Sequence, residues 1–233
     1  MDPTSLAAFV SRELAAVANP DDAGPMAAYM KTDMPFWGVK KPAREQVFRG
    51  VKKGFAPRDR RELEAGIEAL WALPHREEKY MALSYGRRFH TLLTPDSLPL
   101  LERLVREGAW WDFVDDVAGN LLGSLWRRFP DTIAPQMDLW VDDGDLWIRR
   151  SAIIGQLKSK GATDADRLFG YCRLRLHEKE FFIRKAIGWA LRQYSYTAPD
   201  DVIAFLLAHR DELSGLSFRE GAKALRRRGL FPN

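Results

Sequence analysis

One aromatic residue recurs about every 35 residues along the chain, and this repeat constrains the fold more than any other feature. The stretches 113–118, 147–152, 182–187 and 218–223 each start with an aromatic side chain, at intervals of 34, 35 and 36 residues. Each is predicted to begin a helix, and each follows another helical segment, such as 164–176 or 199–209. Two helices per repeat of this length predict an α-solenoid, in which each pair of helices buries its apolar face against its neighbours.

The rest of the chain supports an all-α fold. Apolar residues recur at helical spacing nearly everywhere, strand-like alternation is absent, and Pro and Gly cut the chain into segments of helix length. Weaker matches to the repeat at 80–83 and 38–48 extend the predicted array to about six units. With 233 residues, of which 46% are hydrophobic, we expect a single domain over residues 1–233. The aromatic residues that start the repeats are interpreted first as core residues.

The composition and the apolar segments exclude several kinds of site and a membrane location. Cys172 is the only cysteine, which excludes an intramolecular disulfide and a cysteine-based metal site. The N-terminal stretch lacks the layout of a signal peptide, and no segment holds 18 uncharged apolar residues in a row. We therefore expect a soluble, cytoplasmic protein that acts as a monomer and does not enter a membrane. The net charge of +4 makes an anionic partner plausible.

Basic residues recur with the repeat, and we expect them on the concave face of the solenoid. Cations spaced along such a face suit the regularly charged backbone of a nucleic acid. The plainer alternative is a set of solvated side chains at helix ends. The predicted stripe consists of Arg149, Arg150, Lys158, Lys160, Arg184, Lys185 and Arg192.

One unit breaks the basic pattern, because Asp115 and Asp116 stand where other repeats carry basic pairs, and Trp110, Trp111 and Asp112 precede them. A purine alkylated at N3 or N7 is already cationic and leaves without a general acid. An enzyme that releases it needs aromatic faces for the cation and a carboxylate for the positive charge that develops at C1′. The four histidines have no metal-ligand spacing, and no nucleophile motif or phosphate loop is present.

Several motifs, in one consistent order, resemble the DNA alkylation repair family of HEAT-like-repeat DNA glycosylases, the AlkD type. They lie at 111–115, 146–150 and 187–192, with further matches at 26–31 and 36–40. The resemblance implies release of 3-methyladenine and 7-methylguanine from double-stranded DNA, without metal or cofactor, in base excision repair. It also implies contact with the lesion along a cradle rather than in a deep base-flipping pocket.

By the same resemblance, Asp115 is the catalytic carboxylate, Trp111 and Trp189 are aromatic walls, and Arg150 holds a phosphate. Tyr29 matches a residue near the lesion-contacting surface. Two other functions stay open at this point. One is a non-catalytic protein that binds damaged or branched DNA, and the other is a scaffold for protein interactions, which is a common role of helical arrays.

Overall fold

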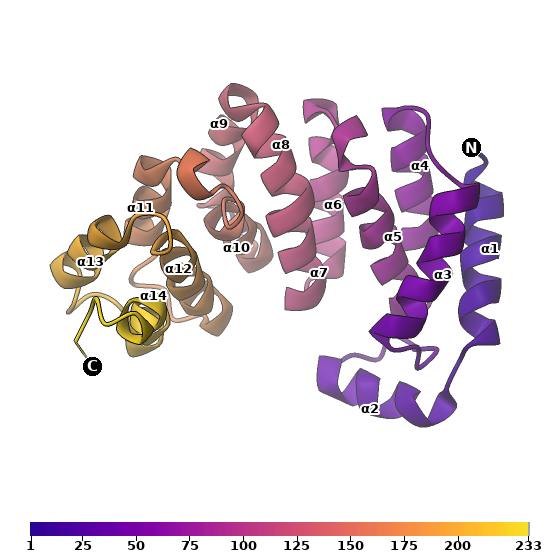
Figure 1. Ribbon diagram of the computed structural model, residues 1–233, viewed down its shortest axis with the longest axis horizontal. Coiled ribbons are helices and arrows are strands. Elements are labelled where there is room, and N and C mark those ends of the chain that lie inside the picture. Colours follow the sequence, from indigo (N-terminus) through magenta and orange to yellow (C-terminus); the bar gives the residue numbers. More distant parts are fainter. Residues whose placement is uncertain (233) are drawn as a thin grey trace. The chain divides into compact units, whose positions relative to one another are not determined.

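The computed structural model describes residues 1–232, and this part of the chain consists of helices joined by loops, without a strand (Figure 1). It divides into two compact units, residues 1–97 and the remainder from Leu98. The predicted all-α fold is therefore confirmed, whereas the predicted single domain stays a prediction. No helix within residues 1–232 has the length and apolar character needed to cross a bilayer.

The first unit packs around α1, which buries Leu6, Val10 and Leu14. The segment after α2 is fastened to the start of α5 by the buried Glu77, whose carboxylate accepts the backbone N–H groups of Trp37 at 3.0 Å and Val39 at 2.9 Å. The helices are α1 (Pro3–Ala16), α2 (Pro20–Met30), α3 (Lys41–Gly54), α4 (Arg60–Trp71) and α5 (Arg76–Arg88), with 3₁₀ turns at His90–Leu92 and Pro95–Ser97.

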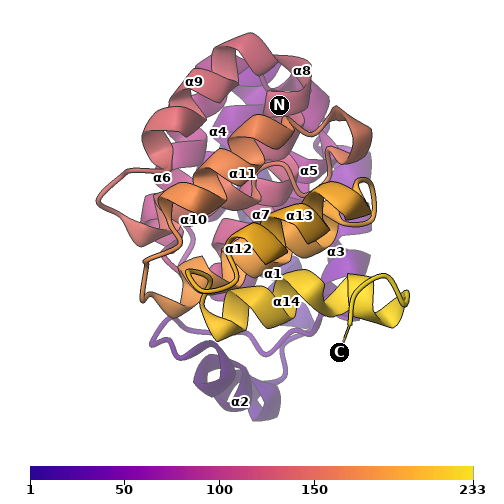
Figure 2. The same cartoon turned by 90° about the vertical axis from the view of Figure 1, so that its left-hand side faces the viewer.

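The second unit consists of successive helical pairs. Its helices are α6 (Leu98–Gly108), α7 (Trp111–Asp116), α8 (Gly123–Arg128), α9 (Pro130–Trp140), α10 (Leu146–Ile154), α11 (Ala165–Leu174), α12 (Phe181–Tyr194), α13 (Pro199–Ala208) and α14 (Gly215–Arg227). A π-helical stretch, Val117–Leu122, joins α7 to α8. Along the unit, α10 packs on α7, α12 on α10 and α14 on α12, as Figure 2 shows for the last pair. The predicted HEAT-like helical repeat is confirmed.

Several helices begin at residues whose side chains cap the N-terminus. The side chain of Asp145 accepts the N–H of Trp147 at 2.7 Å, and Asp164 accepts that of Arg167 at 3.0 Å, which satisfies donors that a helix start leaves open. Helix α13 begins with Pro199, a residue suited to the first helical position. The predicted segments 164–176 and 199–209 therefore agree with α11 and α13 to within two residues at each end.

Glycines bring the stacked helices close together. A Cβ added at Gly123 would lie 2.5 Å from the carbonyl oxygen of Gly155, and one at Gly188 would lie 2.8 Å from that of Ser217. Real Cβ atoms do not approach backbone so closely, so these positions need glycine. Gly123 allows the end of α10 to approach the α7–α8 helix closely, and Gly188 allows α14 to approach α12 closely.

Three of the four aromatic residues that start the repeats are buried, as expected of core residues: Phe113, Trp147 and Phe218. Phe182 is only half-buried. Its ring packs in a small aromatic cluster with Trp147 and Trp110, at centroid distances of 4.8 and 5.5 Å. Phe182 thus lies at the edge of the core, and its backbone carbonyl accepts a hydrogen bond from Arg150.

Candidate active site

Helix α7 presents Trp111 and Asp115 on one face. The two residues are four positions apart, which is about one turn of helix. Trp111 occupies the first position of α7, and Asp115 lies two residues before the π-helical stretch begins at Val117. Such stretches insert an extra residue into a turn and are frequent at functional sites. The Asp115 carboxylate therefore lies close to the junction between the α-helix and the π-helix.

Arg150 holds the Asp115 carboxylate with two parallel hydrogen bonds. The guanidinium Nε donates to Oδ1 at 2.7 Å and Nη2 donates to Oδ2 at 2.8 Å. The remaining terminal nitrogen, Nη1, donates to the backbone carbonyl of Phe182 at 2.6 Å. One arginine on α10 thus ties α7 to the first turn of α12, and its planar fork leaves the carboxylate little freedom to turn.

The pair is partly shielded from solvent, with 4% of the Arg150 side chain and 17% of the Asp115 side chain exposed. Burial raises the pKa of the Asp115 carboxyl above its ordinary value, while the hydrogen bonds and charge of Arg150 act to lower it. Each carboxylate oxygen has two lone pairs, and Arg150 uses one on each. The site therefore offers a fixed anion that can still accept hydrogen bonds from a water molecule or a ligand.

The two predicted aromatic walls differ in their relation to this pair. Trp111 and Trp189 are both half-buried, and within residues 1–232 neither ring stacks on another aromatic side chain. Trp111 shares a face of α7 with Asp115. Trp189 lies seven residues beyond Phe182, or roughly 10 Å further along α12 at 1.5 Å per residue. The structure thus joins Asp115 and Arg150 directly, with Trp111 one turn from Asp115 on α7 and Trp189 on α12.

Four of the seven predicted stripe cations have carboxylate partners. Besides Arg150, Arg149 lies 2.8 Å from Glu178 and donates to the carbonyl of Asp143 at 2.7 Å. Lys185 lies 2.9 Å from Glu220, which Arg192 also contacts. Burial acts to raise the pKa of Glu220, but the cations Lys185, Arg192 and Lys223 together lower it below its ordinary value. The side chains of Arg149, Lys185 and Arg192 are thus engaged within the protein.

The other three stripe cations have no carboxylate partner within residues 1–232. Lys158 donates to the amide oxygen of Asn120 at 2.5 Å, Lys160 is exposed, and the Nε of Arg184 is buried without an acceptor. Tyr29 lies on α2 in the first unit, where 72% of the residue is exposed. Contact of any of these residues with DNA stays a prediction.

The side chains that most often bind metal ions, and the one cysteine, were each placed by the fold. In the part of the chain that the structure describes, no group of three or more His, Cys, Asp or Glu side chains is placed to hold a metal ion. Cys172 is fully buried, and burial raises the pKa of its thiol to about 12. A thiol with that pKa is not a nucleophile at neutral pH.

Sequence reasoning missed three features of this region. The spacing of apolar residues in a regular α-helix, with a period of 3.6 residues, does not reveal the π-helical stretch. The role of the Phe182 carbonyl as an acceptor for Arg150 depends on backbone position alone. Glu178 and Glu220, which neutralise predicted stripe cations, lie 29 and 28 residues from Arg149 and Arg192, so only the packing of neighbouring repeats brings them together.

Comparison with known proteins identifies the family of the chain. The family model described as DNA alkylation repair enzyme matches residues 10–225. The solved structure of a predicted DNA alkylation repair enzyme from Enterococcus faecalis is 32% identical in sequence and superposes with a TM-score of 0.80, covering 89% of this chain and 96% of that one. No curated protein matches the chain. On the extent of the family match and the identity to that structure, the chain belongs to the DNA alkylation repair enzyme family.

Proposed function

We propose that the protein is a monofunctional DNA glycosylase that hydrolyses the N-glycosidic bond of N3- and N7-alkylated purines in double-stranded DNA. In this reaction the bond between C1′ and the purine breaks, and its electrons neutralise the cationic base. The oxygen of a water molecule bonds to C1′ and loses a proton, which leaves an abasic site. Family membership supports the repair of alkylation damage, and 3-methyladenine and 7-methylguanine are the proposed substrates.

The observation that carries the proposal is the Asp115 carboxylate held in a two-pronged pair by Arg150. Positive charge develops at C1′ as the base departs. An anion that is already oriented stabilises this charge without reorganising at the moment of reaction. The free lone pairs of Asp115 also suit it to orient the attacking water. No metal ion or cofactor takes part in these steps.

Aromatic side chains supply the second requirement, a surface for a cationic base. The half-buried indole of Trp111 lies one turn from Asp115, and Trp189 offers a second ring on α12. Indole faces attract cations by about 0.5 to 2 kcal/mol, depending on how far the cation is desolvated. We expect the unpaired stripe cations to contact the phosphates of the duplex, with the protein acting as a monomer.

The test is release of 7-methylguanine from methylated duplex DNA by the native protein and by Asp115→Asn. Loss of one preorganised electrostatic group typically lowers such a rate about 10² to 10³-fold, and we expect a fall of this size with duplex affinity retained. Asp166→Asn, an exposed aspartate on α11, is the matched control and should keep the native rate. Thermal unfolding of each variant establishes that it is folded.

The other outcomes identify different functions. Equal rates for native protein and Asp115→Asn would exclude Asp115 as the group that assists the reaction. No release by either, with salt-dependent affinity for duplex DNA, would indicate a non-catalytic binder of damaged or branched DNA. No DNA affinity at low salt would leave a protein-interaction scaffold.

A further inference from the structure

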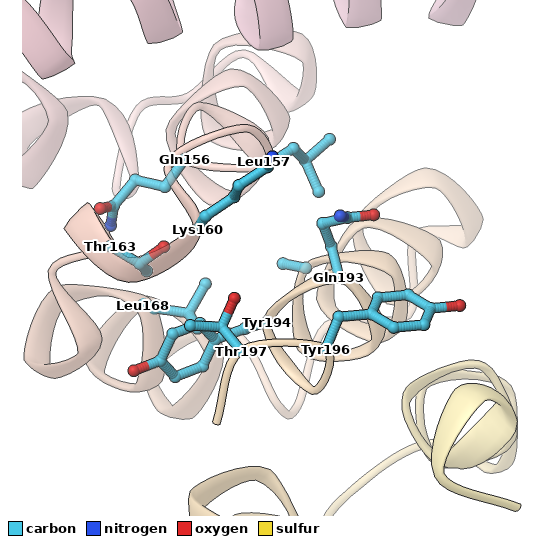
Figure 3. Close-up of a pocket in the computed structure, with 10 residues that line it drawn as sticks. Gln156, Leu157, Lys160, Thr163, Leu168, Gln193, Tyr194, Tyr196 and Thr197 are labelled. Carbon is cyan, nitrogen blue, oxygen red and sulfur yellow. The ribbon is translucent and has the colours of Figure 1, made fainter. Parts of the chain in front are cut away.

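A cavity of about 240 Å³ lies in the second unit between the loop after α10, the start of α11 and the last turns of α12 (Figure 3). Leu157, Leu168 and Ala190 form its apolar part. One water molecule needs about 10 to 15 Å³ of such space, so the cavity can hold a group of several heavy atoms. It is separate from the Asp115–Arg150 pair, and neither partner of that pair lines it.

Apart from the two tyrosines, four polar side chains around this cavity have no partner within residues 1–232. Within residues 1–232, those of Lys160, Thr163, Gln193 and Thr197 make no hydrogen bond or ion pair. Gln156, which also lines the cavity, differs because its amide pairs with the backbone of Asp164 at 2.7 and 3.1 Å. The four unpaired groups are therefore available to a ligand.

The chemistry of these groups favours an anion. Lys160 offers an ammonium, the two threonines offer hydroxyl donors, and Gln193 offers an amide N–H₂, while no carboxylate lines the cavity. Lys160 also adopts a left-handed backbone conformation, with φ of 51°, which is costly for a residue other than glycine. A compact ligand that carries negative charge on several acceptor oxygens, such as a phosphate group, matches this set of donors.

The position of the cavity connects it to the candidate active site. Gln193 lies four residues after Trp189, or about 6 Å further along α12. On the other side, Lys158 of the same loop as Lys160 donates to Asn120, and the Asn120 amide donates to Asp116 at 2.7 Å. The loop that carries Lys160 is thus bonded to the helix that carries Asp115.

We propose that this cavity binds a phosphate group of the DNA strand whose damaged base lies at Asp115. The inference rests on the proposed function for the identity of the strand. Its donors are Lys160, Thr163, Gln193 and Thr197, with Lys160 supplying the charge. A single phosphate seated there would fix how far the duplex advances along α12 relative to Trp189.

The affinity for undamaged duplex DNA, measured by fluorescence anisotropy over a range of salt concentrations, tests the cavity independently of base release. Each neutralised phosphate contributes about 0.9 to the slope of log affinity against log salt concentration. We expect Lys160→Gln to make this slope shallower by about 0.9. Lys179→Gln, an exposed lysine of the same unit without a partner, removes the same charge and should leave the slope unchanged. Equal effects of the two substitutions would overturn the inference.

A second measurement uses the side-chain amide resonance of Gln193 in ¹H–¹⁵N correlation spectra at constant ionic strength. A shift on adding duplex DNA that is lost in Lys160→Gln supports occupancy by a phosphodiester. The same shift with inorganic phosphate supports a site that also accepts free phosphate. No shift with either probe overturns the proposal. Because neither measurement uses damaged DNA, a failure of the glycosylase proposal leaves both results interpretable.

Discussion

At the scale of the residue, the protonation of Asp115 links the site to pH. Burial raises the pKa of this carboxyl, and Arg150 opposes that effect. Below its pKa the carboxyl is neutral and cannot stabilise positive charge at C1′. We therefore expect the rate of 7-methylguanine release to fall as the pH is lowered, and to do so at a higher pH than an exposed aspartate would show.

Substitution of Arg150 should shift the acidic limb of the pH–rate profile, which is the pH range over which the rate falls, and the size of the shift should depend on the new residue. Arg150→Gln removes the cation that opposes burial, so the limb shifts to higher pH. Arg150→Lys keeps the charge but not the two-pronged pair, so its limb lies between those of the native protein and the glutamine variant. Single-turnover rates, corrected for spontaneous release and taken below the melting temperature of each variant, provide the profile. Three superimposable limbs would contradict the role of Arg150.

At the scale of the element, the contact between α12 and α14 depends on Gly188. A methyl group at this position would meet the Cβ of Glu220 at 2.5 Å and the carbonyl oxygen of Ser217 at 2.8 Å. Because the second atom is backbone, α14 must move as a body. We expect Gly188→Ala to lower the free energy of unfolding by about 1 to 3 kcal/mol, as overpacking does, measured by denaturant titration.

Gly170→Ala is the matched control for this prediction. Gly170 lies within α11, and no atom stands within 4 Å of a Cβ added there. Alanine favours helix over glycine by about 1 kcal/mol, so this variant should equal or exceed the native stability. If both substitutions destabilise the protein alike, the loss at 188 cannot come from the contact with α14.

Helix ends could be predicted from the sequence, whereas the register between packed helices could not. The ends of α11 and α13 follow from proline, capping residues and apolar spacing, which are local signals. The spacing of Trp111 and Asp115 likewise places them on one face of a helix. The bond from Arg150 to Asp115 spans 35 residues and requires α10 to advance along α7, which depends on the close approach of Gly123 to Gly155. No local pattern encodes that register.

At the scale of the whole molecule, the net charge is small and evenly divided. The unit of residues 1–97 carries 15 basic and 13 acidic side chains, and the remainder carries 21 and 19, so each contributes +2. Such a weak field does not by itself hold a polyanion. DNA affinity must then depend on which cations are free, and pairing with Glu220 occupies Lys185 and Arg192.

Release of those two cations should therefore strengthen binding more than the change in net charge alone. Glu220→Gln raises the formal charge from +4 to +5 and frees both Lys185 and Arg192 for phosphates. We expect the slope of log affinity against log salt concentration to steepen by up to about 1.8, which is 0.9 for each new phosphate contact. Glu180→Gln produces the same net charge from an exposed carboxylate without a partner in residues 1–232. A slope that steepens in Glu220→Gln but not in Glu180→Gln assigns the effect to the released pair, whereas equal slopes would mean that overall charge governs DNA affinity.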